Sequence, residues 1–574
     1  MFLRLSISKS KNATSYYVKE DVTIDGKRTS KIIEKLGTAE EIKERFGVSD
    51  PKEWALGYIA ELNRLEKEGK EPTVIAKYFP SKLIQTGVQH CFNGGYLFLQ
   101  KVYHELGLHK ISHEIAKKYK FSYNLDSILS RLIYGRILFP ASKLSTYELS
   151  TKLIEKPDFE LHSLYRALEI IAVEKDYIQS ALYNNSQDII KRNTGILYYD
   201  CTNYFFEIEQ EEGIKQYGYS KDHKPNPLVQ MGLFMDRDGI PLAFNITKGN
   251  TNEQNTLTPL EKRILSDFKL SKFIVCTDAG LASNSNRKFN NQAGRAFITT
   301  QSIKKLKGFL KEWALDTSGW HLAGHNGKFD INQINEDEHK DRIFFKERWI
   351  KEDGLEQKLI VAFSLKYRDY HRQIRSSQVQ HAIDLIKKSP AQIKKSRQND
   401  YKRFIEKINC TSDGEIAKNE TYQINTDIIE SEAAYDGFYA MCTNLDEDSS
   451  EIAKINNRRW EIEESFRIMK SEFKARPVYL KRDDRIIAHF TTCFIALLIY
   501  RFVEKKLKEK FTCSRIIEGL RDMNFQELKG YGYVPLFTRS EFTDVLHESF
   551  GFRTDFEIVT LKQMKKIFKD VKCK

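Results

Sequence analysis

The stretch NNRRWEIEESFRIMK, residues 456–470, is the segment from which the fold of this chain can be worked out. Apolar residues recur in and just beyond it at helical spacing: Ile462, Phe466, Met469 and Phe473. This spacing predicts an amphipathic helix with a narrow apolar stripe. The helix should therefore pack one edge against the core of the protein.

A charged stripe runs beside the apolar one. Arg459 and Glu463 are four residues apart and Lys470 follows Glu463 by seven, so all three project from one side of the predicted helix. A carboxylate between two cations at the edge of a buried face suits a site that handles metal and phosphate. The alternative is a surface helix with ordinary salt bridges, which is the more common meaning of such a pattern in isolation.

Length, charge and cysteine usage narrow the class of protein. The chain has 574 residues, 41% of them hydrophobic, and a formal net charge of +13, which favours a polyanionic partner and nucleic acid above all. Its eight cysteines form no CxxC pair, which favours free thiols in a reducing cytoplasm over a zinc site. The longest apolar run, Ile486 to Tyr500, is too short to span a membrane and predicts a buried helix.

Sequence patterns typical of strands lie N-terminal to residues 456–470. Residues 195–207, 228–235 and 240–246 are β-rich, and the turn Asp236 to Gly239 joins the last two. A helix over 256–268 and a strand over 272–280 follow. Three antiparallel strands, a helix and a further strand are the order of a ribonuclease-H-like core. The fold class we predict is therefore α/β.

Two aspartates fall at the ends of these strands. Asp200 lies near the end of the first strand and Asp278 at the end of the fourth, so adjacent strand tips could bring the two carboxylates together. Glu463 would be the third acid, but 185 positions separate it from Asp278, far more than one strand and one helix need. We therefore expect a β-rich insertion domain from about 295 to 435, after which residues 437–443 form a fifth strand.

The insertion carries strand-like pieces and a basic stretch. The strands are expected at 295–300, 342–349 and 358–366, the last two flanking a turn at Asp353-Gly354. The basic stretch is either a solvated face or a path for nucleic acid. Its cations are Lys387, Lys388, Lys394, Lys395, Arg397, Lys402 and Arg403.

The remaining regions are mostly helical. The predicted domains are 1–90 (a small antiparallel sheet with a turn at Asp25-Gly26, then a helix begun by Asp50-Pro51), 91–193 (helices), 194–294 and 436–500 (the two parts of the core), 295–435 (the insertion) and 501–574 (helical). The first is either a scaffold or a clamp for DNA ends. Short helices within 91–193 have the size and spacing of a helix-turn-helix bundle, in which Ser163, Tyr165 and Arg166 would contact a DNA groove. Plain packing is the alternative.

The three acids suggest a particular chemistry. Carboxylates without a His or Cys ligand set suit hard ions such as Mg²⁺ or Mn²⁺. Two such ions about 3.5–4 Å apart can activate a water or a 3′-hydroxyl for in-line attack on a phosphodiester. Arg459 and Lys470 would then neutralise phosphate charge.

These residues resemble a known family. Arg459, Glu463 and Lys470 are similar to the Y-(2)-R-(3)-E-(6)-K signature of DDE transposases of the insertion-sequence-four superfamily, although the signature's tyrosine falls on Asn456. Further matching motifs lie within about 195–500: Tyr199 to Thr202, Gly218 to Asp222, Asp238 to Pro241, Gly249 to Thr251 and Thr277 to Gly280.

The resemblance implies cut-and-paste DNA transposition. Asp200, Asp278 and Glu463 would bind two divalent ions, with Arg459 and Lys470 holding the phosphates beside the scissile bond. The implied partners are double-stranded DNA, both the terminal inverted repeats and the target, and a second copy of the chain, in a prokaryotic cytoplasm at the nucleoid and without a membrane.

Some roles within this scheme have alternatives. Trp460 would either stack on a displaced base or belong to the core. Glu461 and Glu464 are rival third ligands that fall off the charged stripe. His223 is expected to be an ordinary surface histidine.

Two other functions fit the same sequence. One is a metal-dependent nuclease that hydrolyses nucleic acid without strand transfer. The other is a DNA-binding protein without enzyme activity, in which the acids are structural.

Overall fold

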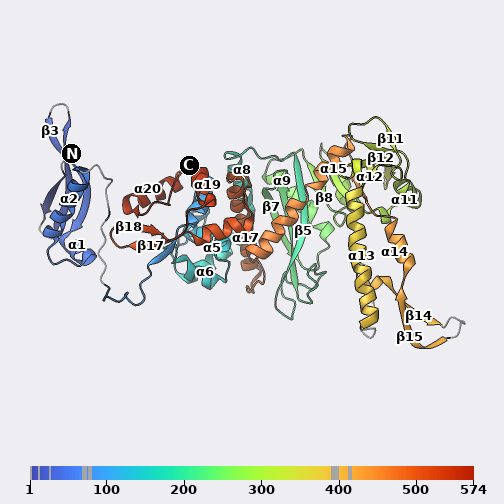
Figure 1. Cartoon of the computed structure of the whole chain (residues 1–574), viewed down its shortest axis with the longest axis horizontal. Coiled ribbons are helices and arrows are strands. Elements are labelled where there is room, and N and C mark those ends of the chain that lie inside the picture. The colour runs from blue at the N-terminus through green and yellow to red at the C-terminus, as the bar shows by residue number, and fades with distance from the viewer. Residues whose placement is uncertain are drawn as a thin grey trace. The chain divides into compact units, whose positions relative to one another are not determined.

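A computed structural model describes residues 3–10, 13–24, 27–67, 74, 80–388, 393, 400–410 and 416–573. The chain forms two compact units, one made of Met1–Ala167 with Ile499–Lys574 and the other of Leu168–Leu498 (Figure 1). The turn expected at Asp25-Gly26 and the cations Lys394, Lys395 and Arg397 lie outside the described residues.

The first unit begins with a three-stranded antiparallel sheet and two helices. These elements are β1 (Leu3–Lys9), β2 (Thr14–Ile24), β3 (Lys27–Thr38), α1 (Ala39–Phe46) and α2 (Pro51–Lys67). Tyr16 and Val18 from the sheet pack on Ile42 and Ile59 from the helices. The Asp50 side chain accepts hydrogen bonds from the backbone N–H groups of the first turn of α2. The predicted small sheet and the helix that follows it are confirmed.

The helical part of the first unit combines residues 91–150 with residues 513–572. Its elements are β4 (Cys91–Asn93), α3 (Tyr96–Glu105), α4 (Leu108–Lys118), α5 (Leu125–Leu138), α6 (Lys143–Ser150), α18 (Cys513–Asp522), β17 (Asn524–Leu528), β18 (Gly532–Pro535), α19 (Glu541–Phe550), β19 (Val559–Thr560) and α20 (Leu561–Lys572). The four strands form one sheet in the order β19-β18-β17-β4, so the C-terminal residues share a sheet with Cys91–Asn93. The predicted helices are present. The pairing of β17 with β4, however, joins residues 91–93 to the C-terminal region, which the sequence pattern assigns to different domains.

The helix with the proposed groove contacts is α7 (Leu161–Val173). Arg166 is exposed and Tyr165 is half-buried, whereas Ser163 is buried. Burial leaves Ser163 unavailable to a DNA groove in this conformation, so of the three residues Arg166 has the exposure that such a contact needs.

The second unit is built on a ten-stranded mixed sheet. Its order is β11-β10-β12-β13-β16-β9-β8-β5-β6-β7. The strands are β5 (Ile196–Phe205), β6 (Leu228–Asp236), β7 (Pro241–Lys248), β8 (Ile274–Thr277), β9 (Ala296–Gln301), β10 (Trp320–Leu322), β11 (Lys328–Phe329), β12 (Ile343–Glu352), β13 (Leu355–Ser364) and β16 (Phe438–Thr443). The strands that the sequence predicts are present, and β5, β6 and β7 pair antiparallel as expected.

The pairing of β9 differs from the simplest sequence interpretation. This strand lies where the insertion was expected to begin, yet it pairs in parallel with β8, which in turn pairs in parallel with β5. The strand β16, expected as the fifth strand of the core, is antiparallel to β9. Pairing between strands far apart in sequence leaves no trace in local periodicity, so the pattern could not distinguish these arrangements.

The two faces of β5 are covered by different helices. Leu197, Tyr199 and Cys201 pack in one cluster with α9 (Leu257–Asp267) and with Tyr183 of α8 (Lys175–Gln187). Alternate residues point the other way, because side chains alternate along a strand. On that second face, Tyr198 donates to the Ile455 carbonyl over 3.0 Å.

Residues 456–470, the segment quoted first, lie on the second face of β5. They form the end of α15 (Ser449–Asn457), α16 (Trp460–Arg467) and part of a π-helical turn, η5 (Ile468–Glu472). As the apolar spacing predicts, Ile462, Phe466 and Met469 are buried. The amphipathic helix is therefore confirmed, with its apolar stripe turned inward.

The apolar run near residue 490 forms α17 (Asp483–Lys506). Its most apolar window has a mean hydropathy of 1.9, and 94% of that window is buried inside the protein. Within the second unit, Phe490 packs on Tyr204 and Phe494 on Phe244. These contacts are those of a core helix, as the sequence predicts.

The rest of the second unit consists of helices and one hairpin. They are α10 (Asn284–Phe289), α11 (Gly308–Leu315), α12 (Glu336–His339), α13 (Leu365–Lys388), α14 (Thr426–Ala433), and the pair β14 (Ile405–Cys410) and β15 (Ile416–Ile424). Trp320, Phe344 and Leu359 belong to a separate apolar cluster under the outer strands. Residues 303–442 thus share this cluster with Phe297 of β9.

Candidate active site

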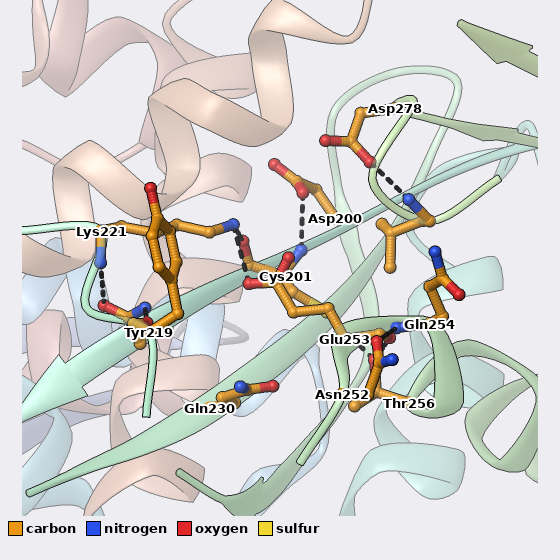
Figure 2. A network of polar contacts seen from close by, with 12 residues as sticks. Asp200, Cys201, Tyr219, Lys221, Gln230, Asn252, Glu253, Gln254, Thr256 and Asp278 are labelled. Carbon is orange, nitrogen blue, oxygen red and sulfur yellow. Dashed lines mark hydrogen bonds and ion pairs between the residues drawn. The ribbon is translucent and has the colours of Figure 1, made fainter. Parts of the chain in front are cut away.

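Asp200, in the middle of β5, and Asp278, directly after β8, lie side by side (Figure 2). The expectation that Asp200 falls near the end of its strand is wrong, because β5 continues to Phe205. Tyr198 of β5 is in register with Cys276 of β8, and each aspartate lies two residues farther along its strand direction. Figure 2 shows the two carboxylates beside each other. Asp200 accepts a hydrogen bond from the Cys201 backbone N–H (2.7 Å), and Asp278 accepts one from the Leu281 N–H (3.0 Å). Local backbone groups thus hold both carboxylates in place.

The surroundings of Asp200 disfavour its ionised form. Burial raises its pKa to about 6, and the nearby charge of Asp278 acts in the same direction. The ammonium of Lys221 and the guanidinium of Arg459 oppose this rise. Asp200 therefore has one acid and two cations as charged neighbours, and ionising it keeps a residual free-energy cost that a further cation would relieve.

Arg459 is fixed at the start of α16 by two polar neighbours. Its Nη1 donates to Thr300 Oγ1 over 3.0 Å, and the Thr300 hydroxyl donates in turn to Asn456 Oδ1 over 3.5 Å. Thr300 is on β9, so the pairing of β9 with β8 brings this anchor to the site. Asn456 stands at the place of the signature tyrosine and belongs to this chain of contacts.

The three glutamates of α16 have different surroundings. Glu461 pairs with Arg458 (2.9 Å) and Glu464 with Arg467 (3.3 Å). Glu463 is exposed, and within the described part of the chain its carboxylate has no hydrogen bond or ion pair. Of the three carboxylates, that of Glu463 is the one free to take a new partner.

In the structure, Glu463 does not form a cluster with Asp200 and Asp278. Among the described residues, no group of three or more His, Cys, Asp or Glu side chains is arranged to hold a metal ion. Asp200 and Asp278 are together, whereas Glu463 stays on the outer side of α16.

Lys470 and Trp460 lie at opposite ends of the α16–η5 segment. Lys470 Nζ is 3.8 Å from Asp222 and lies over the Tyr204 ring, and burial lowers its pKa. Trp460 is 58% exposed, so the core alternative for this indole is wrong. Its exposure leaves an aromatic face open to a ligand.

The cations of the predicted basic stretch differ in exposure and in pairing. Lys387 and Lys388 are exposed at the end of α13. Arg403, in contrast, pairs with Glu432 (2.8 Å) and has a structural partner. Arg403, unlike Lys387 and Lys388, is therefore not simply a solvated cation of that stretch.

Lys221 is the residue that sequence reasoning missed. Its Nζ lies 3.1 Å from Glu253 and donates to the Cys201 carbonyl, next to Asp200 (Figure 2). The available signal was the motif from Gly218 to Asp222, which contains this lysine, but its role could not be assigned without the contact. His223, two residues on, is exposed.

The fold and the site define a mixed α/β protein with paired carboxylates on two neighbouring parallel strands. Residues 204–499 match the family described as Transposase DDE domain. Because this match covers more than half of the 574 residues, the chain belongs to that family and is a DDE-type DNA transposase. A comparison with curated proteins finds no match.

Among solved structures, the chain is similar to piggyBac transposase in a synaptic complex with hairpin DNA. The sequence identity is 8%, the TM-score is 0.35, and the similarity covers 84% of each chain.

Proposed function

We propose that this transposase cuts an insertion sequence out at its terminal inverted repeats and joins the ends to target DNA, as a member of the insertion-sequence-four superfamily. The observation that carries the proposal is the apposition of Asp200 and Asp278 beside Arg459. Paired acids next to a fixed guanidinium suit a phosphodiester whose charge increases during in-line displacement.

The strand order supports a ribonuclease-H-like core. The five strands β7-β6-β5-β8-β9 combine three antiparallel strands with two parallel ones, and α9 covers one face. In this proposal the insertion domain begins after β9, near residue 302, and ends before α15. Its apolar cluster also includes Phe297, so the insertion packs directly on the strand that precedes that boundary.

The family depends on divalent metal ions, and the donors fit them. Asp200 and Asp278 offer oxygen ligands only, which Mg²⁺ and Mn²⁺ prefer, and their mutual repulsion is the kind of cost that a bound cation offsets. We assign two ions to Asp200, Asp278 and Glu463. When bound, such ions activate the attacking oxygen and stabilise the leaving one.

The chain's own residues would orient the DNA. Arg459, anchored on Thr300, would hold a nonbridging phosphate oxygen with its planar fork, and Lys470 would bind a neighbouring phosphate as a point charge. The exposed ring of Trp460 would stack on an unpaired base. Arg166, Lys394 and Lys395 are proposed to contact DNA farther from the cleaved bond.

Two DNA ends must be brought together before joining, so a homodimer on double-stranded DNA is the proposed assembly. The test is to incubate the protein with a duplex ending in the element's inverted repeat, together with Mg²⁺ or Mn²⁺ and a target plasmid. Joined product is the expected result. Cleavage without joining would favour the nuclease, and retarded but intact DNA would favour a protein that only binds DNA.

The pKa of Asp200 predicts how divalent-ion binding depends on pH. A carboxyl with a pKa of about 6 holds its proton where an ordinary aspartate is ionised, and that proton must leave before a metal ion binds. Mn²⁺ affinity of the DNA-free protein should therefore fall roughly tenfold for each pH unit below about 6. Calorimetric titration with Mn²⁺ between about pH 5 and pH 8 measures this affinity. An affinity that stays constant down to pH 5 would contradict the prediction.

A further inference from the structure

The loop from Gly218 to Lys224 is placed firmly beside the aspartate pair. Gly218 lies against the Gly249 backbone, where a Cβ atom would come within 2.0 Å of the carbonyl oxygen. The Tyr219 carbonyl accepts a hydrogen bond from Asn203 Nδ2 (2.9 Å). The first contact holds the loop against the end of β7, and the second holds it against β5, the strand that carries Asp200.

Lys221 extends from this loop to the edge of β5. Its ammonium donates to the Cys201 carbonyl and pairs with Glu253 at 3.1 Å (Figure 2). Its side chain nevertheless remains 33% exposed. The charge therefore lies next to Asp200 while part of the side chain still faces solvent, from which a DNA strand would approach.

The next residue connects the loop to η5. Asp222 forms an ion pair with Arg476 and lies 3.8 Å from Lys470 Nζ. A carboxylate between these two cations keeps the loop against the segment that follows α16. Lys221 is consequently positioned from both sides, by β5 and by the region of Lys470.

We propose that Lys221 binds the phosphate at the bond to be cut, beside Asp200. This inference rests on the proposed function, because it takes Asp200 as part of the catalytic centre. The ammonium would supply a point charge for a nonbridging oxygen, and Glu253 and the Cys201 carbonyl would hold it before DNA arrives. Little reorganisation would then be needed as charge increases on the phosphate.

The alternative for Lys221 is a structural ion pair that only fastens Glu253 to β5. The two roles differ in their consequences. A structural lysine would act through stability, and its loss would be reproduced by removing the charge of its partner. A phosphate-binding lysine would act on the reaction and on the salt dependence of DNA binding, whatever the charge at residue 253.

The experiment compares Lys221→Ala and Lys221→Arg with Lys224→Ala and Glu253→Gln. Lys224 is the matched control, since it is an exposed lysine of the same loop whose ammonium lies over the Phe205 ring. Cleavage of the end duplex gives kcat and KM. DNA binding without divalent ions gives the slope of log affinity against log salt, and thermal unfolding reports stability.

The expected result is a loss of cleavage on the order of 100-fold for Lys221→Ala, partial recovery in Lys221→Arg, and a much smaller loss in Glu253→Gln. The salt slope should fall by about one unit in Lys221→Ala but not in Glu253→Gln. With a neutral methylphosphonate at the scissile position, the cleavage difference between wild type and Lys221→Ala should largely disappear. Lys224→Ala should behave like wild type in cleavage.

Three outcomes would overturn the proposal: unchanged cleavage and salt slope in Lys221→Ala, an equal loss in Glu253→Gln, or a loss explained by a lower unfolding temperature. If wild-type protein fails to cleave the end, the proposed function fails, while the salt slope measured without metal still decides whether Lys221 binds a phosphate.

Discussion

An Asp200→Ala variant is expected to bind end DNA nearly as wild type does and to have no measurable cleavage. The same is expected of Asp278→Ala and Glu463→Ala, because each removes a proposed ligand of the ions that activate and stabilise the reacting oxygens. A loss on the order of 10³-fold or more follows from several kcal/mol of transition-state stabilisation. Gel retardation measures binding, and denaturing electrophoresis of labelled DNA measures cleavage.

The control for this set is Asp267→Ala. Asp267 is an exposed aspartate at the end of α9, on the other face of the sheet, so its loss changes the net charge equally without touching the site. It should cleave as wild type does. Retained cleavage in Asp200→Ala or Asp278→Ala would refute the assignment of the catalytic centre. Retained cleavage in Glu463→Ala alone would move the third ligand to Glu461 or Glu464.

An Arg192→Met variant is expected to be the most destabilised of the variants considered, by about 3–5 kcal/mol. Arg192 Nε donates to Asp236 at the end of β6, and the two side chains are 1% and 0% exposed. Its other nitrogens donate to Ser186 and to the carbonyls of Ile240 and Pro241. Removing the guanidinium leaves a buried carboxylate without its countercharge. Urea unfolding, followed by fluorescence, measures the loss.

A second substitution separates the cost of an unpaired charge from the value of the pair. Adding Asp236→Leu to Arg192→Met should recover much of the stability, because an apolar pair can replace a buried ion pair. For comparison, Lys454→Ala breaks an exposed pair with Glu451 and should cost less than about 1 kcal/mol. An Arg192→Met loss as small as that would show that Asp236 is solvated or protonated.

The α16 segment shows which features a local sequence pattern predicts and which depend on tertiary contacts. Its apolar residues have the helical spacing that burial requires, so the sequence predicts which side of the helix is inside. The turn at Asp236 to Gly239 likewise specifies the β6–β7 hairpin. Lys221 was not assigned a role, because its contacts with Cys201 and Glu253 bridge residues 20 or more positions apart.

The sequence by itself determined the strands, the helices, the buried character of α17 and the candidate acids, since periodicity, turn residues and charge are local properties. Only the tertiary structure decided that β9 joins β8 in parallel, that the C-terminal strands pair with β4, and that Lys221 stands beside Asp200 while Glu463 faces outward. Those facts depend on pairing between distant segments and on side-chain position, for which one chain's local pattern carries no physical signal.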